Sequence, residues 1–299
     1  MNRLRYGIIL SITLIGFSSL LAQKQGSDKL AERIKEEFGK NKGFFALAFR
    51  NVDSGEELLI NEREPFHAAS TMKTPVMIEL YKQAKQGKFS LTDSIVIKNE
   101  FKSIVDGSLY QLNPADDSEF GLYKIVGQKR PLYDVMYQMI IASSNLATNI
   151  LIEKVDARKV TETIRGMGAQ DLMVLRGVED SKAFAKGLNN SVTAYDLMLL
   201  FDAIANGKAV SVSASGEMIK ILLDQKFSEI IPALLPTGVR VAHKTGSIRG
   251  VQHDSGIVLL PDGRKYTLVI LSKGLTEEKS AIQSMALVSK MVYDYFKSN

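Results

Sequence analysis

The sequence FHAASTMKTPVM, residues 66–77, contains the chain's single Ser-x-x-Lys pattern, which runs from Ser70 to Lys73. Pro75 has no backbone N–H and belongs in or beside a first helical turn, so a helix is predicted to start close to Ser70. Residues i and i+3 share a helix face, which lets the Lys73 amine reach the Ser70 hydroxyl. A serine hydroxyl is a weak nucleophile until a base removes its proton. The pattern predicts a lysine-activated serine; an N-cap serine beside a solvated lysine is the alternative.

Helical periodicity continues from this stretch to about residue 235. The predicted helices cover residues 76–86, 132–141, 145–155, 157–167, 193–205 and 215–223. Residues 99–128 form the least regular stretch and are partly acidic. A long connection of this kind predicts a surface loop near a cleft.

Strand patterns flank this helical region on both sides. The predicted elements are a helix over residues 27–38, strands over 43–52, 57–61, 241–248, 252–260 and 266–272, and a final helix over about 277–296. Pro261-Asp262-Gly263 is predicted to close the last two strands into a hairpin. This order indicates an α+β fold, in which a five-stranded antiparallel sheet built from both termini is flanked by helices and carries an inserted all-α domain.

The same order predicts the domain boundaries. Residues 23–68 plus 236–299 are expected to form the α/β domain with the antiparallel sheet, and residues 69–235 the all-α domain. The active site is then expected in the cleft between the two domains.

Residues 1–22 are predicted to be a signal peptide. Arg3 and Arg5 precede an apolar run over residues 8–21, and Leu20-Leu21-Ala22 is an acceptable cleavage site. An uncleaved anchor is the alternative, although the run is short for a membrane span. No cysteine precedes the predicted mature start, which excludes a lipoprotein anchor. We expect an exported protein, periplasmic or secreted, with no stable membrane span after signal cleavage.

Composition excludes several classes of function. The formal net charge is +5, of which Arg3 and Arg5 contribute two. The remaining basic residues are not clustered into a stripe, so nucleic-acid binding is not expected. The absence of cysteine excludes disulfides and zinc–thiolate sites. The three histidines, His67, His243 and His253, lack metal-ligand spacing. We therefore expect no metal, no cofactor and a monomer.

Two further patterns each occur once. Ser143-Ser144-Asn145 lies between two apolar helical segments, where it predicts either simple N-capping or a proton shuttle beside a substrate-binding amide. Lys244-Thr245-Gly246 lies inside the strand VAHKTGSIRG, where it predicts either an edge strand with a solvated lysine or a cationic strand lining the site. Gly246 permits close approach of a substrate, and the amide of Ser247 can donate to an oxyanion.

The three patterns, in this order at a helix start, an interhelix turn and a strand, resemble the penicillin-recognising serine hydrolases. FHAASTMKTPVM, IASSNLATNILIE and HKTGSIRG are similar to three segments of class A β-lactamases. The resemblance extends over essentially the whole chain after the signal, since the predicted order of elements also agrees. It implies the β-lactamase/transpeptidase-like fold and a small-molecule β-lactam or peptidoglycan-like substrate.

The resemblance also implies a role for each matching residue. Ser70 is the expected acylated nucleophile, Lys73 its proton acceptor or relay, and Ser143 the group that passes the proton to the leaving nitrogen. The expected substrate-binding residues are Asn145 for the acylamide, Lys244 and Thr245 for the carboxylate, and Ser247, whose amide would form the oxyanion hole with that of Ser70.

The pattern departs from class A at two places. The middle residue of the second motif is Ser144, where class A enzymes carry an aspartate. The deacylation base of class A is a glutamate followed four residues later by an asparagine; here Glu179 is the candidate, and Ala183 stands four residues on. Asn149 matches a position that braces this loop, which favours Glu179. An exposed loop acid is the alternative reading of Glu179.

The expected function is therefore an exported serine β-lactamase that works through an acyl-Ser70 intermediate. A peptidoglycan D,D-peptidase or related esterase, or a covalent β-lactam sensor with slow deacylation, is the alternative. Glu179 separates them, because acylation and deacylation are distinct steps of covalent catalysis.

Overall fold

The computed structural model describes residues 25–298, so the predicted signal peptide lies outside the described residues. Its centre is a five-stranded antiparallel sheet in the order β2 (Glu57–Ile60), β1 (Phe44–Asn51), β11 (Lys265–Lys273), β10 (Val251–Leu259) and β9 (Arg240–Ile248). In β1 and β11, Phe44 pairs with Lys273 and Asn51 with Tyr266, so the two ends of the chain meet at the middle of the sheet. The predicted α+β fold with a sheet built from both termini is confirmed.

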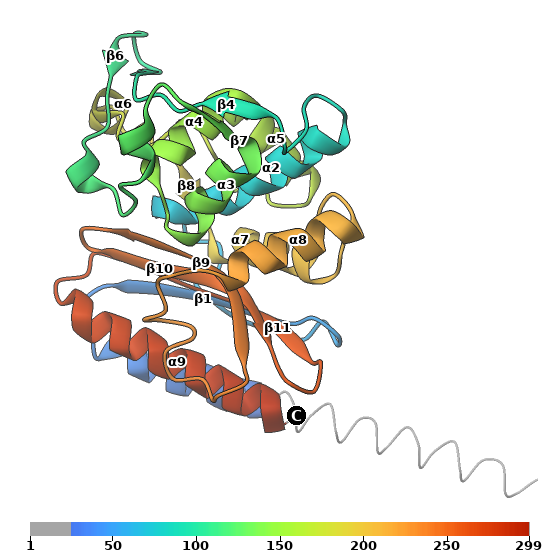
Figure 1. Ribbon diagram of the computed structural model, residues 1–299. Coiled ribbons are helices and arrows are strands. Elements are labelled where there is room, and N and C mark those ends of the chain that lie inside the picture. Colours follow the sequence, from blue (N-terminus) through green and yellow to red (C-terminus); the bar gives the residue numbers. More distant parts are fainter. Residues whose placement is uncertain (1–24, 299) are drawn as a thin grey trace, which may run out of the picture.

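Alternation along β1 assigns its side chains to two different cores. Phe45, Leu47 and Phe49 pack in a core with the helix over residues 25–39 and with α9 (Glu278–Ser298), which cover one face of the sheet (Figure 1). Ala46 and Ala48 face the other core. Their small side chains suit the close approach of α7 (Ala194–Ala205), which packs against β1, β10 and β11.

The other helices form a layer above that second face (Figure 1). They are α2 (Lys73–Lys85), α3 (Leu132–Ile141), α4 (Asn145–Val155), α5 (Ala157–Gly166), α6 (Ser181–Ala185) and α8 (Val212–Leu223). Three two-stranded ribbons join them: β3 (Phe66–His67) with β8 (Ser191–Val192), β4 (Ser94–Val96) with β7 (Lys129–Pro131), and β5 (Phe101–Lys102) with β6 (Leu109–Tyr110).

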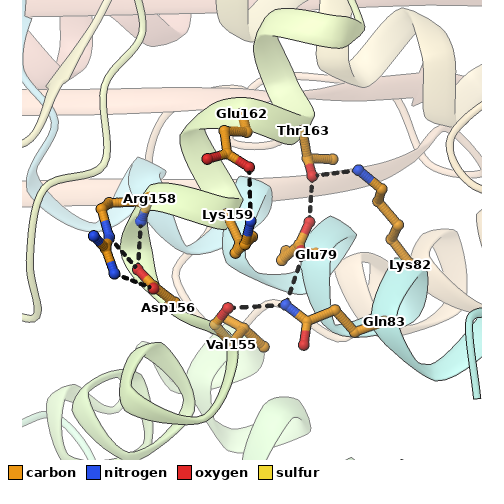
Figure 2. Close-up of polar contacts among 9 residues, drawn as sticks. All are labelled: Glu79, Lys82, Gln83, Val155, Asp156, Arg158, Lys159, Glu162 and Thr163. Carbon is orange, nitrogen blue, oxygen red and sulfur yellow. Dashed lines mark hydrogen bonds and ion pairs between the residues drawn. The ribbon is translucent and has the colours of Figure 1, made fainter. Parts of the chain in front are cut away.

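A buried polar contact fixes α2 against α5 (Figure 2). The Glu79 carboxylate, on α2, is buried and accepts hydrogen bonds from Gln83 at 2.6 Å and from Thr163 of α5. The Gln83 amide also donates to the Val155 carbonyl at 2.8 Å, and Lys82 donates to Thr163 at 2.8 Å. Since a buried carboxylate without donors is costly, these bonds hold α2, the helix that begins at Lys73, in one position.

Residues 99–128, expected to be a surface loop, contain β5, β6 and two 3₁₀ turns, η2 (Pro114–Asp116) and η3 (Leu122–Ile125). Much of this segment is exposed, but Asp117 is only 4% exposed. The segment therefore reaches into the protein as well as over its surface.

Candidate active site

Ser70 lies in a short 3₁₀ turn, η1 (Ala69–Met72), directly before α2 rather than on the α-helix itself. Ala69 has a φ of 44°, an unfavourable value for a residue with a Cβ. The turn is held because the Ala69 N–H donates to His67 Nδ1 at 3.1 Å and the Thr71 hydroxyl donates to the Ala68 carbonyl at 2.6 Å. The neighbouring residues thus impose the backbone conformation that carries the serine.

Strand β9 packs directly on this turn. A Cβ added to Gly246 would lie 3.1 Å from the backbone nitrogens of both Ser70 and Thr71. A larger residue would push the strand away from the serine, so glycine permits the close approach of the third motif to the first.

The Lys73 side chain is fully buried and joins the first two motifs. Its Nζ lies 2.9 Å from Ser70 Oγ, as the i, i+3 spacing predicted. It also lies 2.7 Å from the Ser143 carbonyl oxygen, 3.2 Å from Ser143 Oγ and 3.0 Å from Asn145 Oδ1. One amine therefore contacts the expected nucleophile, the expected shuttle and the expected substrate-binding amide.

Burial lowers the pKa of Lys73 to about 7, although the negative charges of Asp117 and Glu179 act to raise it. The desolvation of a buried amine disfavours its charged form. A lysine whose pKa lies near neutrality is partly unprotonated at neutral pH and can accept a proton from a hydroxyl. A solvated lysine is almost wholly protonated at that pH and cannot.

Ser143 stands between two lysines. Its Oγ accepts from Lys244 Nζ at 3.0 Å as well as from Lys73, and Lys244 also donates to the Thr245 carbonyl at 2.9 Å. Burial, followed by the charge of Lys73, holds the pKa of Lys244 well below its usual range, against the opposing effect of Asp254. The serine hydroxyl is thus placed to pass a proton between two amines of lowered pKa.

Asn145 connects this cluster to the loop that carries Glu179. The Asn145 side-chain amide donates to Glu179 Oε1 at 2.7 Å, while its oxygen accepts from Lys73. Burial raises the pKa of Glu179, and the Asn145 hydrogen bond opposes the rise. Glu179 has a φ of 61°, a strained value that persists only where the surrounding contacts impose it.

Two asparagines hold the backbone of the loop that carries Glu179. Asn149, on α4, accepts from the Val178 N–H at 2.6 Å and donates to the Val178 carbonyl at 3.0 Å, as expected for a bracing residue. Asn190 accepts from the Leu175 N–H at 2.8 Å and donates to the Arg176 carbonyl at 3.0 Å. The glutamate is therefore held next to the cluster by contacts to the backbone of its own loop.

Two cavities meet at the cluster. One, of about 500 Å³, lies toward Thr245 and the 116–118 segment; the other, of about 570 Å³, lies toward Glu179. Ser70, Asn145 and Ser247 line both. Ser70 therefore lies where the two cavities adjoin.

Each histidine ring contacts another group of the protein. His243 Nδ1 lies 2.8 Å from the buried Asp254 carboxylate, and His253 Nε2 lies 2.9 Å from the His67 carbonyl oxygen. Burial lowers the pKa of His253 to about 4, so this ring is neutral. Among residues 25–298, no group of three or more histidine, aspartate or glutamate side chains is arranged to hold a metal ion.

Asp117 is the residue that sequence reasoning missed. One of its carboxylate oxygens, Oδ2, accepts from the backbone N–H groups of Asn145 at 2.9 Å and Leu146 at 3.0 Å. The acidic character of residues 99–128 was visible in the sequence, but no periodicity connects position 117 to position 145.

Comparison with known proteins identifies the family. A sequence model of the β-lactamase enzyme family matches residues 29–296, and the chain therefore belongs to that family. The extended-spectrum β-lactamase PER-1 of Pseudomonas aeruginosa is 24% identical, and the match covers 95% of this chain and 92% of PER-1. The predicted resemblance to penicillin-recognising serine hydrolases is confirmed.

Solved structures share the fold. A β-lactamase from Sphaerobacter thermophilus is 25% identical with a TM-score of 0.75, and the match covers 90% of this chain and 96% of that one. PBP-A is 24% identical with a TM-score of 0.76, and the match covers 91% of this chain and 97% of PBP-A.

Within residues 25–298, no helix has the length and apolar character needed to cross a membrane.

Proposed function

We propose that this protein is an exported, class A-like serine β-lactamase that hydrolyses the β-lactam amide through an acyl-Ser70 intermediate. The contact between Lys73 Nζ and Ser70 Oγ, at 2.9 Å, carries the proposal. It places an amine of lowered pKa, which can accept a proton, beside the hydroxyl of the only serine in a Ser-x-x-Lys pattern. Residues 1–22 are proposed to direct export, which N-terminal sequencing of the exported protein tests. The active molecule is proposed to be a monomer.

Acylation begins when the neutral Lys73 amine takes the Ser70 proton and Ser70 Oγ attacks the carbonyl carbon of the β-lactam. The oxygen of that carbonyl becomes negative and is stabilised by the backbone N–H groups of Ser70 and Ser247. As the C–N bond breaks, the leaving nitrogen takes a proton from Ser143, whose hydroxyl is resupplied by Lys73 or Lys244. The product is an ester on Ser70.

Substrate binding uses the remaining residues of the cleft. Lys244, with the Thr245 hydroxyl, is proposed to bind the substrate carboxylate, whose negative charge favours the protonated form of Lys244, and Asn145 is proposed to bind the acylamide group. Thr245 lines the first cavity and Asn145 lines both, which supports the carboxylate in the first cavity and the acylamide side chain in the second.

Deacylation is proposed to use Glu179 as general base. A water molecule attacks the ester carbonyl and Glu179 accepts its proton; that proton then passes to Ser70 Oγ as the ester C–O bond breaks, which restores both the Ser70 hydroxyl and the Glu179 carboxylate. The raised pKa of Glu179 supports this role, because a carboxylate of higher pKa is a better proton acceptor.

The surroundings of Glu179 favour slow deacylation, as in a D,D-peptidase or a covalent sensor. The Glu179 carboxylate is hydrogen-bonded to Asn145, and Ala183, four residues later, offers no side-chain amide to help position water. Asn190 on the same loop is occupied by the backbone of residues 175 and 176. The alternative predicts one equivalent of acylation followed by little turnover.

Hydrolysis of a chromogenic cephalosporin by the purified protein decides between these proposals. A β-lactamase gives sustained colour development over many turnovers, whereas a sensor or peptidase gives a burst limited to one equivalent. An absence of both burst and turnover with penicillins and cephalosporins would contradict the main proposal.

The lowered pKa of Lys73 predicts the pH dependence of acylation. Three charged groups face this amine: Asp117, Glu179 and Lys244. With a pKa of about 7, roughly a tenth of the amine is neutral at pH 6 and about nine tenths at pH 8. Since the neutral amine is the proton acceptor, the acylation rate should rise about tenfold from pH 6 to pH 8. Stopped-flow acylation by a slowly released penicillin measures this, and a rate that stays flat across that range would argue against Lys73 as the base.

A further inference from the structure

The N-terminus of α4 is capped by a carboxylate from a distant segment. The first N–H groups of a helix have no partner within the helix. Ser144 Oγ accepts from the Ala147 N–H at 3.2 Å, while Asp117 Oδ2 accepts from the N–H groups of Asn145 and Leu146. A negative charge at this end of a helix is stabilised by the helix dipole.

Asp117 is itself rigidly held. The same Oδ2 atom accepts from the Tyr123 hydroxyl at 2.9 Å and lies 3.4 Å from Ser144 Oγ, while Oδ1 accepts from the Glu119 N–H at 3.1 Å. The adjacent Ser118 hydroxyl donates to the Ala142 carbonyl at 2.6 Å. Two consecutive residues therefore contact the Ser143 turn on its two sides, one before Ser143 and one after it.

The turn that they hold is strained. Ser143 has a φ of 56°, and non-glycine residues keep such values only where the surrounding contacts impose them. In this conformation the Ser143 hydroxyl contacts both lysines. Two residues later, the Asn145 side chain contacts Lys73 and Glu179. The side chains of the turn itself, Ser143-Ser144-Asn145, carry no charge.

Asp117 also acts through its charge. The negative charge of Asp117 raises the pKa of Lys73 against the effect of burial, and it adds to the rise in the pKa of Glu179. Loss of this charge should therefore lower the pKa of Lys73, a change that a purely structural contact would not produce.

We propose that Asp117 is a positioning residue, which holds Ser143 and Asn145 in their reactive arrangement by supplying a carboxylate to the uncharged turn before α4. The proposal rests on the proposed function, since it assigns roles to Ser143 and Asn145. No part of the first, second or third motif contains this residue, because it comes from the 99–128 segment.

The first test is Asp117→Asn, which keeps the side-chain shape and removes the charge. Loss of hydrogen bonds to a charged acceptor predicts Ser70 acylation roughly 10- to 100-fold slower than in the wild type, with folded structure verified by circular dichroism. Because the pKa of Lys73 should fall, the acidic limb of the pH profile of the acylation rate should also move to lower pH. Glu100→Gln, which removes an exposed acid of the same segment, is the matched control and should leave both quantities unchanged.

The second test moves the carboxylate instead of removing it. Ser144→Asp alone places a second carboxylate beside Asp117 and should slow acylation. In Asp117→Asn/Ser144→Asp, the new carboxylate can cap α4 and accept from the amide introduced at position 117, so acylation should recover by about tenfold over Asp117→Asn. If Asp117→Asn does not fold, recovery in the double variant still supports the proposal.

The outcomes distinguish this proposal from the proposed function. A wild-type protein that no β-lactam acylates refutes the proposed function itself. A wild type that is acylated, together with an Asp117→Asn variant of equal rate and pH profile, refutes only the role of Asp117. A folded double variant that remains as slow as Asp117→Asn also refutes it.

Discussion

The Ser70→Ala variant is expected to lose β-lactam hydrolysis by a factor of at least about 10³, because no acyl-enzyme can form without its oxygen. Ser143 also contacts Lys73, at 3.2 Å, but its hydroxyl contacts Lys244 as well, at 3.0 Å, which supports the proposed role of a proton shuttle between two amines. The variant removes only the hydroxyl of Ser70, the one partly exposed residue of a turn whose other residues are buried, so the fold should persist. Steady-state hydrolysis of a chromogenic cephalosporin and labelling by a fluorescent penicillin measure the loss.

Ser213→Ala provides a matched control, since Ser213 is an exposed serine on α8, far in sequence from all three motifs. It should retain wild-type hydrolysis and labelling. Continued labelling of the Ser70→Ala protein at the wild-type stoichiometry would mean that another residue is acylated, and the mechanism would then need a different nucleophile.

The Glu179→Gln variant is expected to be acylated at nearly the wild-type rate and to release the acyl group about 10²- to 10⁴-fold more slowly. Glutamine matches glutamate in shape, and its oxygen can still accept the hydrogen bond from Asn145, so the loop should keep its position. What the substitution removes is the proton acceptor. Intact-protein mass spectrometry after mixing with a penicillin should show the acyl adduct accumulating on Ser70.

Three results of this experiment have different meanings. Accumulation of the adduct assigns deacylation to Glu179. Unchanged turnover contradicts that role, and loss of acylation as well as turnover means that Glu179 takes the first proton in place of Lys73. Glu162→Gln, which alters an exposed acid on α5, is the control and should turn over as the wild type does.

The sequence predicted the fold and the members of the central cluster for identifiable physical reasons. The spacing of Ser70 and Lys73 is a property of helical geometry, so their contact followed from local rules. The sheet followed from strand patterns of period two at both ends of the chain. The resemblance supplied the residues of the other two motifs, but the contacts of both lysines with Ser143 are seen only in the structure, because no local rule joins three separate motifs.

Other features of the site depend on tertiary contacts that no local pattern encodes. Asp117 meets the N-terminus of α4 across 28 positions of sequence, and Glu179 meets Asn145 across 34. The segment that contains Asp117 was identified as the least regular stretch, which missed β5, β6 and two 3₁₀ turns and says nothing of where one buried side chain points. The roles of the eight predicted site residues remain predictions until the variants are measured.

The pairing of β1 with β11 has a consequence for how the protein is made. Asn51 pairs with Tyr266, so the centre of the sheet cannot form until nearly the whole chain has been synthesised. Lys244, which contacts Ser143, lies on β9, and β9 joins the sheet by pairing with β10, which pairs with β11. Long-range pairing of this kind makes folding slow and concerted. A nascent chain carries Ser70 long before it carries Lys244, so the proposed mechanism predicts reactivity toward substrate only after β9 has been synthesised and has folded.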